Sequence, residues 1–129
     1  MNFEGTRVHV PMTEHGKLAT RELAEYLVKL GTARKVTRGQ ILTDVTSKMM
    51  GSDYGRKKRA GIRIARDVSQ MVSRMEHAGV VYSQFDDVRS SDGTSTRELF
   101  FSVTAVGNRI LPEIVKVAHN GLGISQGPI

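Results

Sequence analysis

The densest group of chemically active side chains in this sequence is a run of cations. Between residues 54 and 66 the chain carries six basic residues and no acidic one, and the next carboxylate is that of Asp67. The six are Arg56, Lys57, Lys58, Arg59, Arg63 and Arg66. Ammonium and guanidinium groups neutralise phosphates, and arginine also forms paired hydrogen bonds with base edges. The chemistry indicated by this run is therefore the binding of a polyanion.

The same stretch, Tyr54 to Val81, has the periodicity of an amphipathic helix. Apolar or small residues follow one another at steps of four, three, four and three, which is the spacing of one helical face. That stripe is Gly61, Ala65, Val68, Val72 and Met75, widened by Ile62, Ile64 and Met71. Another face carries Arg59, Arg63, Arg66, Gln70 and Arg74. We expect a helix that packs one side on a core, presents cations outward and ends at Gly79.

The charge of the whole chain is uneven along its length. Its 129 residues carry a net charge of +6; residues 1–79 hold 15 basic against 8 acidic residues, and residues 80–129 hold 4 against 5. Basic asymmetry of this kind indicates a polyanionic partner that is met by one side of the molecule. The alternative interpretation is a solvated basic face on an ordinary core helix.

Residue types suited to catalysis or metal binding do not form a convincing group. The sequence has no cysteine, which excludes disulfides, thiolate catalysis and cysteine-based zinc sites. His9 and His15 lack a third ligand at helical spacing, and the Asp86-Asp87 pair is expected to be solvated. The segment GSDYGRKK lacks the Gly-Lys-Ser/Thr ending of a phosphate-binding loop. We therefore expect a protein that is not an enzyme and that needs no cofactor or metal.

Membrane insertion and base stacking are also disfavoured by composition. No apolar run approaches the ~20 residues that cross a bilayer. The first residues, MNFEGTRVHV, lack the pattern of a secretion signal, so a cytoplasmic protein is expected. Aromatic residues make up 5% of the chain and tryptophan is absent, which disfavours binding modes built on several stacked bases.

Two helices are predicted before the basic run. Residues 17–30 place leucines on one face and charged residues on the other, and Gly31 ends the helix. Residues 37–50 begin at a capping box formed by Thr37 and Gln40. A short strand through Arg34 to Val36 precedes this second helix. Residues 1–16 are predicted to form an N-terminal arm, in which Pro11 limits any strand to an edge.

Strand periodicity follows Gly79, and a final helix follows the strands. The segments from Val80 to Phe85 and from Arg97 to Thr104 alternate, which predicts an antiparallel ribbon with the polar tip DDVRSSDGTST. Residues 107–120 predict a fourth helix with Pro112 in an early turn, and residues 121–129 a flexible tail. Its apolar stripe of Ile110, Ile114 and Val117 is a candidate dimer surface or packs within one subunit. The expected fold is mainly α with a small antiparallel β-hairpin, an α+β class.

The order of helix, helix, helix, two-stranded ribbon and helix resembles a winged helix-turn-helix domain over residues 17–120. Residues 66–115 resemble the MarR-type regulators. In that family Leu-Glu-x-x-Gly-Leu ends the recognition helix, and Leu-Thr-x-x-Gly leads from the wing into the next helix. The matching segments are Met75-Glu76-His77-Ala78-Gly79-Val80 and Val103-Thr104-Ala105-Val106-Gly107. Thr37 is similar to the family's helix-starting threonine.

The chain departs from that family between its second and third helices. Thr37 and Ser69 are separated by 32 residues, which is more than a tight turn allows. The additional segment MMGSDYGRKKRAG is either a basic loop or an extension of the recognition helix. The family's N-terminal dimerisation helix is short or absent here, and Asp87-Val88-Arg89 only approaches its usual Asp-x-Arg pattern in the wing. The resemblance therefore extends to the winged-helix superfamily and not to the family's ligand sensing.

The resemblance implies that the third helix lies in the major groove of double-stranded DNA. It places Arg63, Arg66 and Gln70 against base edges. Phosphates would be neutralised by Lys48, Arg56, Lys57, Lys58 and Arg59. On the wing, Arg89 and Arg97 would touch the backbone or the minor groove, or would only keep the hairpin soluble.

The function expected from these features is that of a transcriptional regulator, or repressor, acting as a homodimer on two half-sites about 34 Å apart. One alternative is a DNA-binding module of replication or plasmid partition. The other is a module that uses the same basic face on RNA or on an acidic protein.

Overall fold

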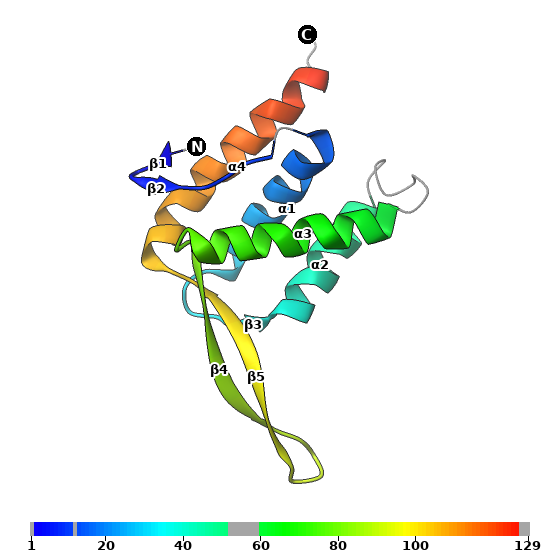
Figure 1. Cartoon of the computed structure of the whole chain (residues 1–129), viewed down its shortest axis with the longest axis vertical. Helices are drawn as coiled ribbons and strands as arrows, with labels where there is room; N and C mark the ends of the chain where they lie inside the picture. The colour runs from blue at the N-terminus through cyan, green and yellow to red at the C-terminus, as the bar shows by residue number, and fades with distance from the viewer. Residues whose placement is uncertain (1, 12, 52–59, 127–129) are drawn as a thin grey trace.

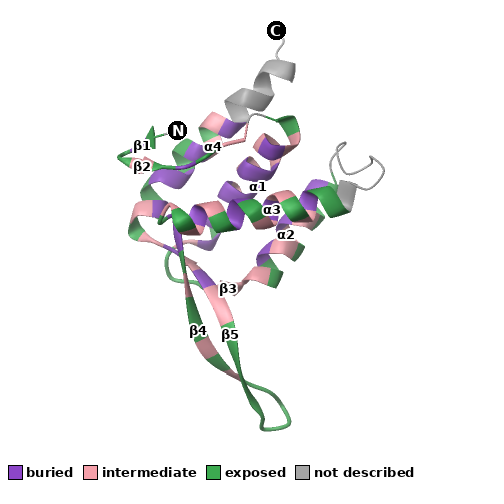
Figure 2. Cartoon of the chain, in the orientation of Figure 1, coloured by how far each residue is buried: buried purple, intermediate pink, exposed green. Residues whose placement is uncertain are grey.

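The computed structural model describes residues 2–11, 13–51 and 60–126, which form helices around a small antiparallel sheet (Figure 1). The elements are β1 (Asn2–Phe3), β2 (Thr6–Arg7), α1 (Glu14–Leu30), β3 (Val36–Thr37), α2 (Arg38–Met50), α3 (Ala60–His77), β4 (Val81–Arg89), β5 (Ser95–Val103) and α4 (Ala105–Gln126). The predicted α+β class is confirmed for this part of the chain. Buried residues from α1, α2, α3, α4 and the base of the β4–β5 hairpin form one core (Figure 2).

Helix α1 begins three residues earlier than the sequence predicted. The hydroxyl of Thr13 accepts a hydrogen bond from the backbone N–H of Gly16 at 3.2 Å, and this cap starts the helix at Glu14. Gly31 ends it as predicted, because its N–H donates to the carbonyl of Leu27 at 3.1 Å. The helix buries Ala19, Leu23, Ala24 and Leu27 and packs most extensively against α4.

Helix α2 begins at the predicted cap. The hydroxyl of Thr37 accepts from the N–H of Gln40 at 3.1 Å. The side-chain amide of Gln40, which the capping-box prediction directed back to Thr37, instead donates to both carboxylate oxygens of Asp44 at 2.9 and 3.0 Å. The strand predicted over residues 34–36 is shifted by two residues at its start, because β3 pairs Val36 with Phe101 and Thr37 with Phe100.

Helix α3 ends at His77, and Gly79 supplies the left-handed turn after it, as predicted. Gly79 has φ 81°, which glycine adopts without steric cost, and the N–H of Val80 donates to the carbonyl of Met75 at 2.9 Å. The chain then enters β4, which pairs antiparallel with β5 from Val81↔Val103 to Arg89↔Ser95, so the predicted ribbon is confirmed. The strand order is β3-β5-β4, and the far half of the hairpin projects from the helical body (Figure 1).

Helix α4 differs from its prediction at both ends. Thr104 caps it through the N–H of Gly107 at 2.9 Å, so the helix starts at Ala105 and continues through Gln126, beyond the end predicted at residue 120. Pro112 consequently lies inside the helix and not in an early turn. Its ring nitrogen donates no hydrogen bond, so the carbonyl four residues earlier loses its helical partner.

The apolar stripe of α4 is part of the core of a single chain. Ile110, Leu111, Ile114 and Ala118 are fully buried within the chain, and Val117 is partly buried. The prediction that Ile110 and Ile114 belong to a dimer surface is therefore wrong, because α1 and the rest of the core already cover them. Of the two interpretations of this stripe, packing within one subunit is the correct one.

Candidate nucleic-acid interface

The apolar face of α3 is buried as the sequence predicted. Ile64, Val68, Met71, Val72 and Met75 are each at most 1% exposed. Burying a side chain of this size stabilises a fold by about 1.5–3 kcal/mol. This face therefore holds α3 firmly on the core, and the opposite face is left to solvent.

The exposed face of α3 carries the predicted base-contacting residues. Arg63, Arg66 and Gln70 are all exposed, and the same face continues through Ser73 and His77 at helical spacing. We call these five residues the α3 outer stripe. Among the residues that the structure describes, no ion pair involves Arg63 or Arg66. Both guanidinium groups are thus presented to solvent on a rigid helix, which Figure 2 shows running across the front of the molecule.

Two residues of α3 lie on faces other than those predicted. Ile62, which the sequence placed beside the buried stripe, is 76% exposed. Arg74, which the sequence placed with the outward cations, is half-buried, and its guanidinium approaches the sulfur of Met71 at 3.7 Å. The cationic face of α3 is therefore narrower than predicted and has an apolar residue at its N-terminal end.

Asp67, the first acid after the basic run, does not neutralise the arginines of the outer stripe. It lines a small pocket with Thr13 and Gly16 at the N-terminus of α1, and one of its carboxylate oxygens is buried without a hydrogen bond from the described residues. The N-terminus of a helix carries a partial positive charge that favours a nearby carboxylate. This placement leaves the positive charges of Arg63 and Arg66 unopposed.

Arg38 was not selected from the sequence, and the structure gives it a positioning role. Its guanidinium donates to the carbonyl and hydroxyl of Ser69 at 2.7 and 3.0 Å and to the hydroxyl of Ser73 at 2.8 Å. It also lies 5.8 Å from the centroid of the Phe101 ring. Arg38 therefore ties the start of α2, the middle of α3 and the base of the hairpin together. Its hydrogen-bond partners lie 31 to 35 residues away, so nothing in local spacing predicted this role.

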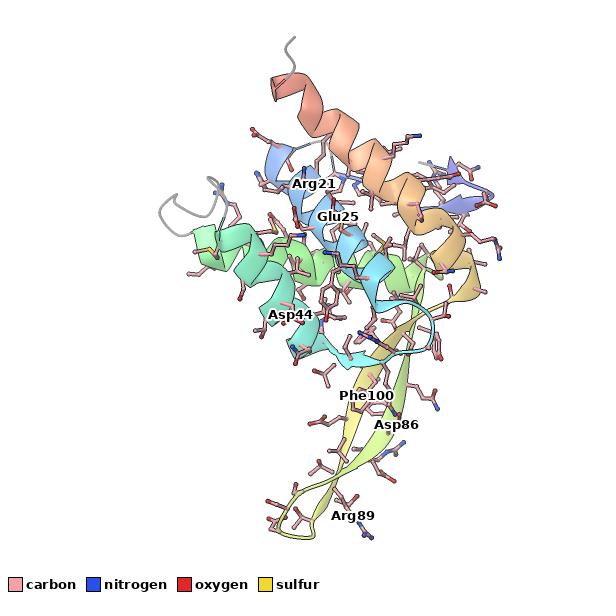
Figure 3. The ribbon with its side chains drawn as sticks, turned by 180° about the vertical axis from the view of Figure 1, so that it is seen from behind. Arg21, Glu25, Asp44, Asp86, Arg89 and Phe100 are labelled. Atoms are coloured by element: carbon pink, nitrogen blue, oxygen red, sulfur yellow. The ribbon has the colours of Figure 1, made fainter. Side chains whose placement is uncertain are left out.

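The β4–β5 hairpin carries the two predicted wing arginines in different settings. Arg89 is exposed and lies near the far end of the hairpin (Figure 3). Arg97 is exposed too, but its guanidinium stacks over the ring of Phe85 at 5.2 Å and lies opposite Asp87 in the register. The cation–π contact restrains Arg97. Arg89 is thus the wing cation placed farther from the body of the protein.

The turn at the hairpin tip is ordered by a short polar network. The N–H and hydroxyl of Thr94 donate to Oδ1 of Asp92 at 3.0 and 2.6 Å, and these hydrogen bonds lower the pKa of the Asp92 carboxyl. At its base, the hairpin is held to the helical body by an ion pair of Lys35 with Asp86 and by Lys35 over the ring of Phe100 at 4.9 Å. These contacts connect the β4–β5 hairpin to the segment that precedes β3.

Of the remaining predicted phosphate contacts, the structure describes Lys48 alone, and Lys48 lies on α2. Lys48 Nζ lies 3.2 Å from Glu22 and 3.4 Å from Glu25 of α1, and the hydrogen bond to Glu22 is the main reason that the pKa of Lys48 is raised. This geometry favours a structural role for Lys48, linking α2 to α1, over the predicted contact with phosphate. Arg56, Lys57, Lys58 and Arg59 lie outside the described residues, so their predicted role stays a prediction.

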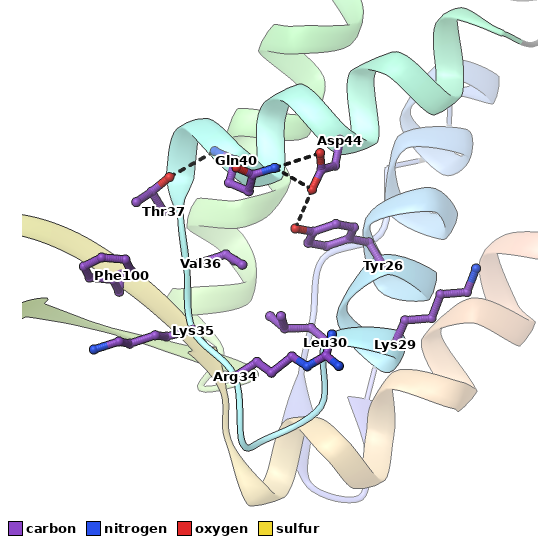
Figure 4. Close-up of a pocket in the computed structure, with 10 residues that line it drawn as sticks. All are labelled: Tyr26, Lys29, Leu30, Arg34, Lys35, Val36, Thr37, Gln40, Asp44 and Phe100. Atoms are coloured by element: carbon purple, nitrogen blue, oxygen red, sulfur yellow. Dashed lines mark hydrogen bonds between the residues drawn. The ribbon is translucent and has the colours of Figure 1, made fainter.

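A pocket of about 710 Å³ lies on another side of the molecule, between α1, α2 and the sheet (Figure 4). Its wall contains Tyr26, whose hydroxyl donates to Oδ2 of Asp44 at 2.9 Å. Burial, together with that hydrogen bond and the nearby negative charge, raises the pKa of Tyr26 to about 12. Lys29, Arg34 and Lys35 stand at its rim and are exposed.

Comparison with known proteins adds no assignment to this geometry. No family model matches the chain, and comparisons with curated proteins and with solved structures found no significant match. Within the described ranges, no three histidine or acidic side chains are grouped closely enough to hold a metal ion. No helix in that same part of the chain has the length and apolar character needed to span a bilayer.

Proposed function

We propose that this chain is a sequence-specific, double-stranded-DNA-binding transcriptional regulator of winged helix-turn-helix architecture. The single observation that carries the proposal is α3, which buries one face completely and presents Arg63, Arg66 and Gln70 on the other. A helix with side chains is about 10–12 Å wide, which matches the ~12 Å width of the major groove. The rigid seating of α3 would allow its outer stripe to enter that groove.

The order of elements supports the same proposal. Helix α2 precedes α3, the β4–β5 hairpin follows it, and β3 adds a third strand at the base of the hairpin. In a winged helix the hairpin lies beside the DNA when the recognition helix is in the groove. The projection of the hairpin from the helical body and its two exposed arginines are what such a wing requires (Figure 1).

Each exposed residue has a distinct proposed role. Arginine recognises guanine and glutamine recognises adenine through paired hydrogen bonds, each worth about 1–3 kcal/mol of discrimination. We assign these contacts to Arg63, Arg66 and Gln70. Arg89 would contact the phosphate backbone or the minor groove, and Arg38 would position α3 without touching DNA.

The test is charge reversal on the outer stripe. A binding site is selected from random duplexes with the wild-type protein, and affinity is measured by fluorescence anisotropy. We expect Arg63→Glu/Arg66→Glu to lower the affinity by at least about 100-fold, because two base-contacting cations become repulsive. The melting temperature should stay within a few degrees of wild type, because both side chains are exposed and unpaired among the described residues.

A matched control variant has the same net charge as Arg63→Glu/Arg66→Glu. Lys29→Glu/Lys116→Glu makes the same change at exposed positions of α1 and α4, and we expect a much smaller loss of affinity. Equal losses in the two double variants would contradict recognition by α3. Preference of the wild type for duplex RNA over duplex DNA would also contradict the proposal, since the deep, narrow groove of RNA does not admit a helix.

A homodimer is part of the proposal, and it predicts a pseudo-palindromic site with half-sites about 34 Å apart. Because Ile110 and Ile114 are buried, the pairing would use a surface other than the predicted α4 stripe. Sedimentation equilibrium of the protein with and without its selected duplex measures the stoichiometry.

A further inference from the structure

The N-terminal arm and the end of α3 enclose a second cationic site, which the sequence did not single out. A groove of about 670 Å³ is lined by Arg7 and His9 of the arm and by Ser73, Arg74, His77 and Ala78 of α3 and the residue after it. We call it the arm groove. None of the described residues that line it is acidic, so two guanidinium groups and two imidazoles face one hollow without a carboxylate from that part of the chain.

The arm is fixed on the core, and this fixes the direction of its cations. Phe3 and Val8 are 3% and 1% exposed and belong to the core. In an extended chain, successive side chains point to opposite sides, so an inward Val8 directs Arg7 and His9 outward. Both are exposed. Strands β1 and β2 pair as a small hairpin, in which Asn2 accepts from the N–H of Gly5 at 2.9 Å.

The carboxylates nearest to the groove in sequence are engaged elsewhere. Glu4 lies 3.9 Å from Arg109 of α4, and Glu76 accepts a hydrogen bond from the hydroxyl of Ser83 on β4. Neither lines the arm groove. Asp67 lines the neighbouring small pocket together with Arg74, but no ion pair joins the two among the described residues. The positive charge of Arg7 and Arg74 is therefore available to a ligand, and it would attract an anion with several acceptor oxygens.

The arm groove is continuous with the α3 outer stripe. Ser73 and His77 belong to both. Figure 1 shows the arm passing along one side of α3 while the β4–β5 hairpin leaves on the other. A helix seated in a major groove has a phosphodiester backbone on each side of it. The arm and the hairpin thus flank α3 where those two backbones would run.

We propose that the arm groove binds a phosphate group of the DNA backbone, held by Arg7 and Arg74 with His9 and His77 as further donors. This inference rests on the proposed function and adds to it a second anchoring point, on the side of α3 opposite to the hairpin. Contacts with phosphate set affinity and register without reading sequence.

The experiment compares wild type with Arg7→Ala/His9→Ala on the selected duplex and on a random duplex, over a range of salt concentrations. Removing the guanidinium of Arg7 and the imidazole of His9 should lower the affinity for both duplexes by the same factor, at least about tenfold. The slope of log affinity against log salt should become shallower by about 0.9 for each phosphate that is no longer neutralised. Lys116→Ala is the control for removal of one cation elsewhere, and circular dichroism checks that the arm variant folds.

The outcomes separate this inference from the proposed function. Unchanged affinity and slope in the arm variant, with tight binding by wild type, would overturn the arm groove and leave recognition by α3 intact. Weaker binding to the selected duplex alone would also overturn it, since a phosphate contact is blind to sequence. If wild type binds no duplex, the proposed function fails and backbone binding fails with it.

A titration with inorganic phosphate then tests whether the arm groove also binds free phosphate. Shifts of the His9 and His77 imidazole resonances that are abolished in Arg7→Ala would support a phosphate site. Resonances that do not move would overturn it.

Discussion

The hydroxyl of Tyr26 illustrates how one buried contact changes the chemistry of a residue. It donates to Asp44, which also accepts from Gln40, so the phenol faces a carboxylate whose acceptor sites are in use (Figure 4). Ionising this phenol would place two negative charges side by side in a partly dry site. Burial of the phenol first, and then the hydrogen bond and negative charge of Asp44, raise the pKa of Tyr26 from 10.0 to about 12.

This shift predicts a loss of stability at alkaline pH. Between about pH 10 and pH 12 the unfolded chain releases the phenolic proton while the folded chain keeps it. The contribution of Tyr26 to stability is thus fully present below pH 10 and is lost as the pH rises toward 12. Tyr26→Phe lacks the titrating group, so its free energy of unfolding should fall less steeply in this window. Urea denaturation of both proteins at pH 8, 10 and 11 measures the difference, and a constant difference would contradict the shift.

Single residues also mark where sequence periodicity is informative and where it fails. The buried positions of α3 from Ile64 to Met75 were predicted correctly, because their stripe repeats over three turns. Ile62 and Arg74 were placed on the wrong faces of α3. Each lies at the edge of a stripe, where the helical rotation of about 100° per residue does not separate the buried face from the exposed face. Arg38 and Arg7 could not be selected at all, since their roles depend on residues that are distant in sequence.

At the scale of elements, the start of α4 is locked to the end of α3. The hydroxyl of Thr104 donates to the carbonyl of Gly79 at 2.6 Å, and the backbone N–H of Thr104 donates to the carbonyl of Val80 at 3.0 Å. A Cβ on Gly107 would stand 2.0 Å from the carbonyl oxygen of Val80. The two segments that carried the family resemblance in the sequence are therefore in contact. The close approach requires a glycine at position 107, whereas the positive φ favours a glycine at position 79.

Gly107→Ala should accordingly destabilise the fold. The added methyl group cannot be accommodated unless the backbone moves, and overpacking of this kind costs about 1–3 kcal/mol, or more where backbone must shift. Gly39→Ala is the matched control, because Gly39 is exposed in α2 and its nearest neighbour to a new Cβ is 3.9 Å away. We expect Gly39→Ala to be neutral or stabilising by up to about 1 kcal/mol. Chemical denaturation measures both, and equal stabilities would contradict the close approach.

The elements themselves were predictable, and several of their boundaries were not. The sequence predicted the four helices and the ribbon from periodicity and glycine positions. The starts of α1 and α4 were missed because Thr13 and Thr104 cap them. A capping threonine differs from other threonines only in the backbone N–H that its hydroxyl accepts from, and the sequence does not show that hydrogen bond. The error at Thr104 also placed Pro112 in an early turn, which shows how one missed cap changes the interpretation of a whole helix.

At the scale of the molecule, the hairpin is an appendage that the core does not need. From residue 86 to residue 98 no side chain is buried. The segment from residue 87 to residue 97 contains two aspartates and two arginines, so removing it leaves the net charge unchanged. Its effect on binding can therefore be separated from effects on folding and on overall charge.

Replacing residues 87–97 by Asn-Gly should leave stability within about 1 kcal/mol of wild type, since surface changes away from the core are small. Asp86 and Glu98 are register partners, so a two-residue turn can close the shortened hairpin. If Arg89 and Arg97 contact phosphates, affinity should fall and the salt slope should become shallower by up to about 1.8. Anisotropy over a salt series measures both. Unchanged binding would mean that the wing arginines only keep the hairpin soluble.

The charge asymmetry seen in the sequence has a clear but incomplete counterpart in space. It drew attention to α3, whose exposed face does carry Arg63 and Arg66, yet it gave every cation the same weight. In the fold Lys48 is paired with α1, whereas Arg7, far from the basic run in sequence, lies beside the end of α3. Charge counts predict that a polyanion is a suitable partner, and only the packing of elements decides which cations meet it.

The contacts of Thr104 and Gly107 with the end of α3 fix one end of that helix, so any tilt of α3 would be largest at its other end. Arg63 lies 14 residues from His77, a lever arm of about 21 Å at 1.5 Å per residue. A tilt of about 5° at the fixed end would sweep the guanidinium of Arg63 through about 2 Å, enough to break a paired hydrogen bond. The buried side chains of Ile64 and Val68 oppose such a tilt, so they keep Arg63 and Arg66 within the narrow tolerance that paired hydrogen bonds require.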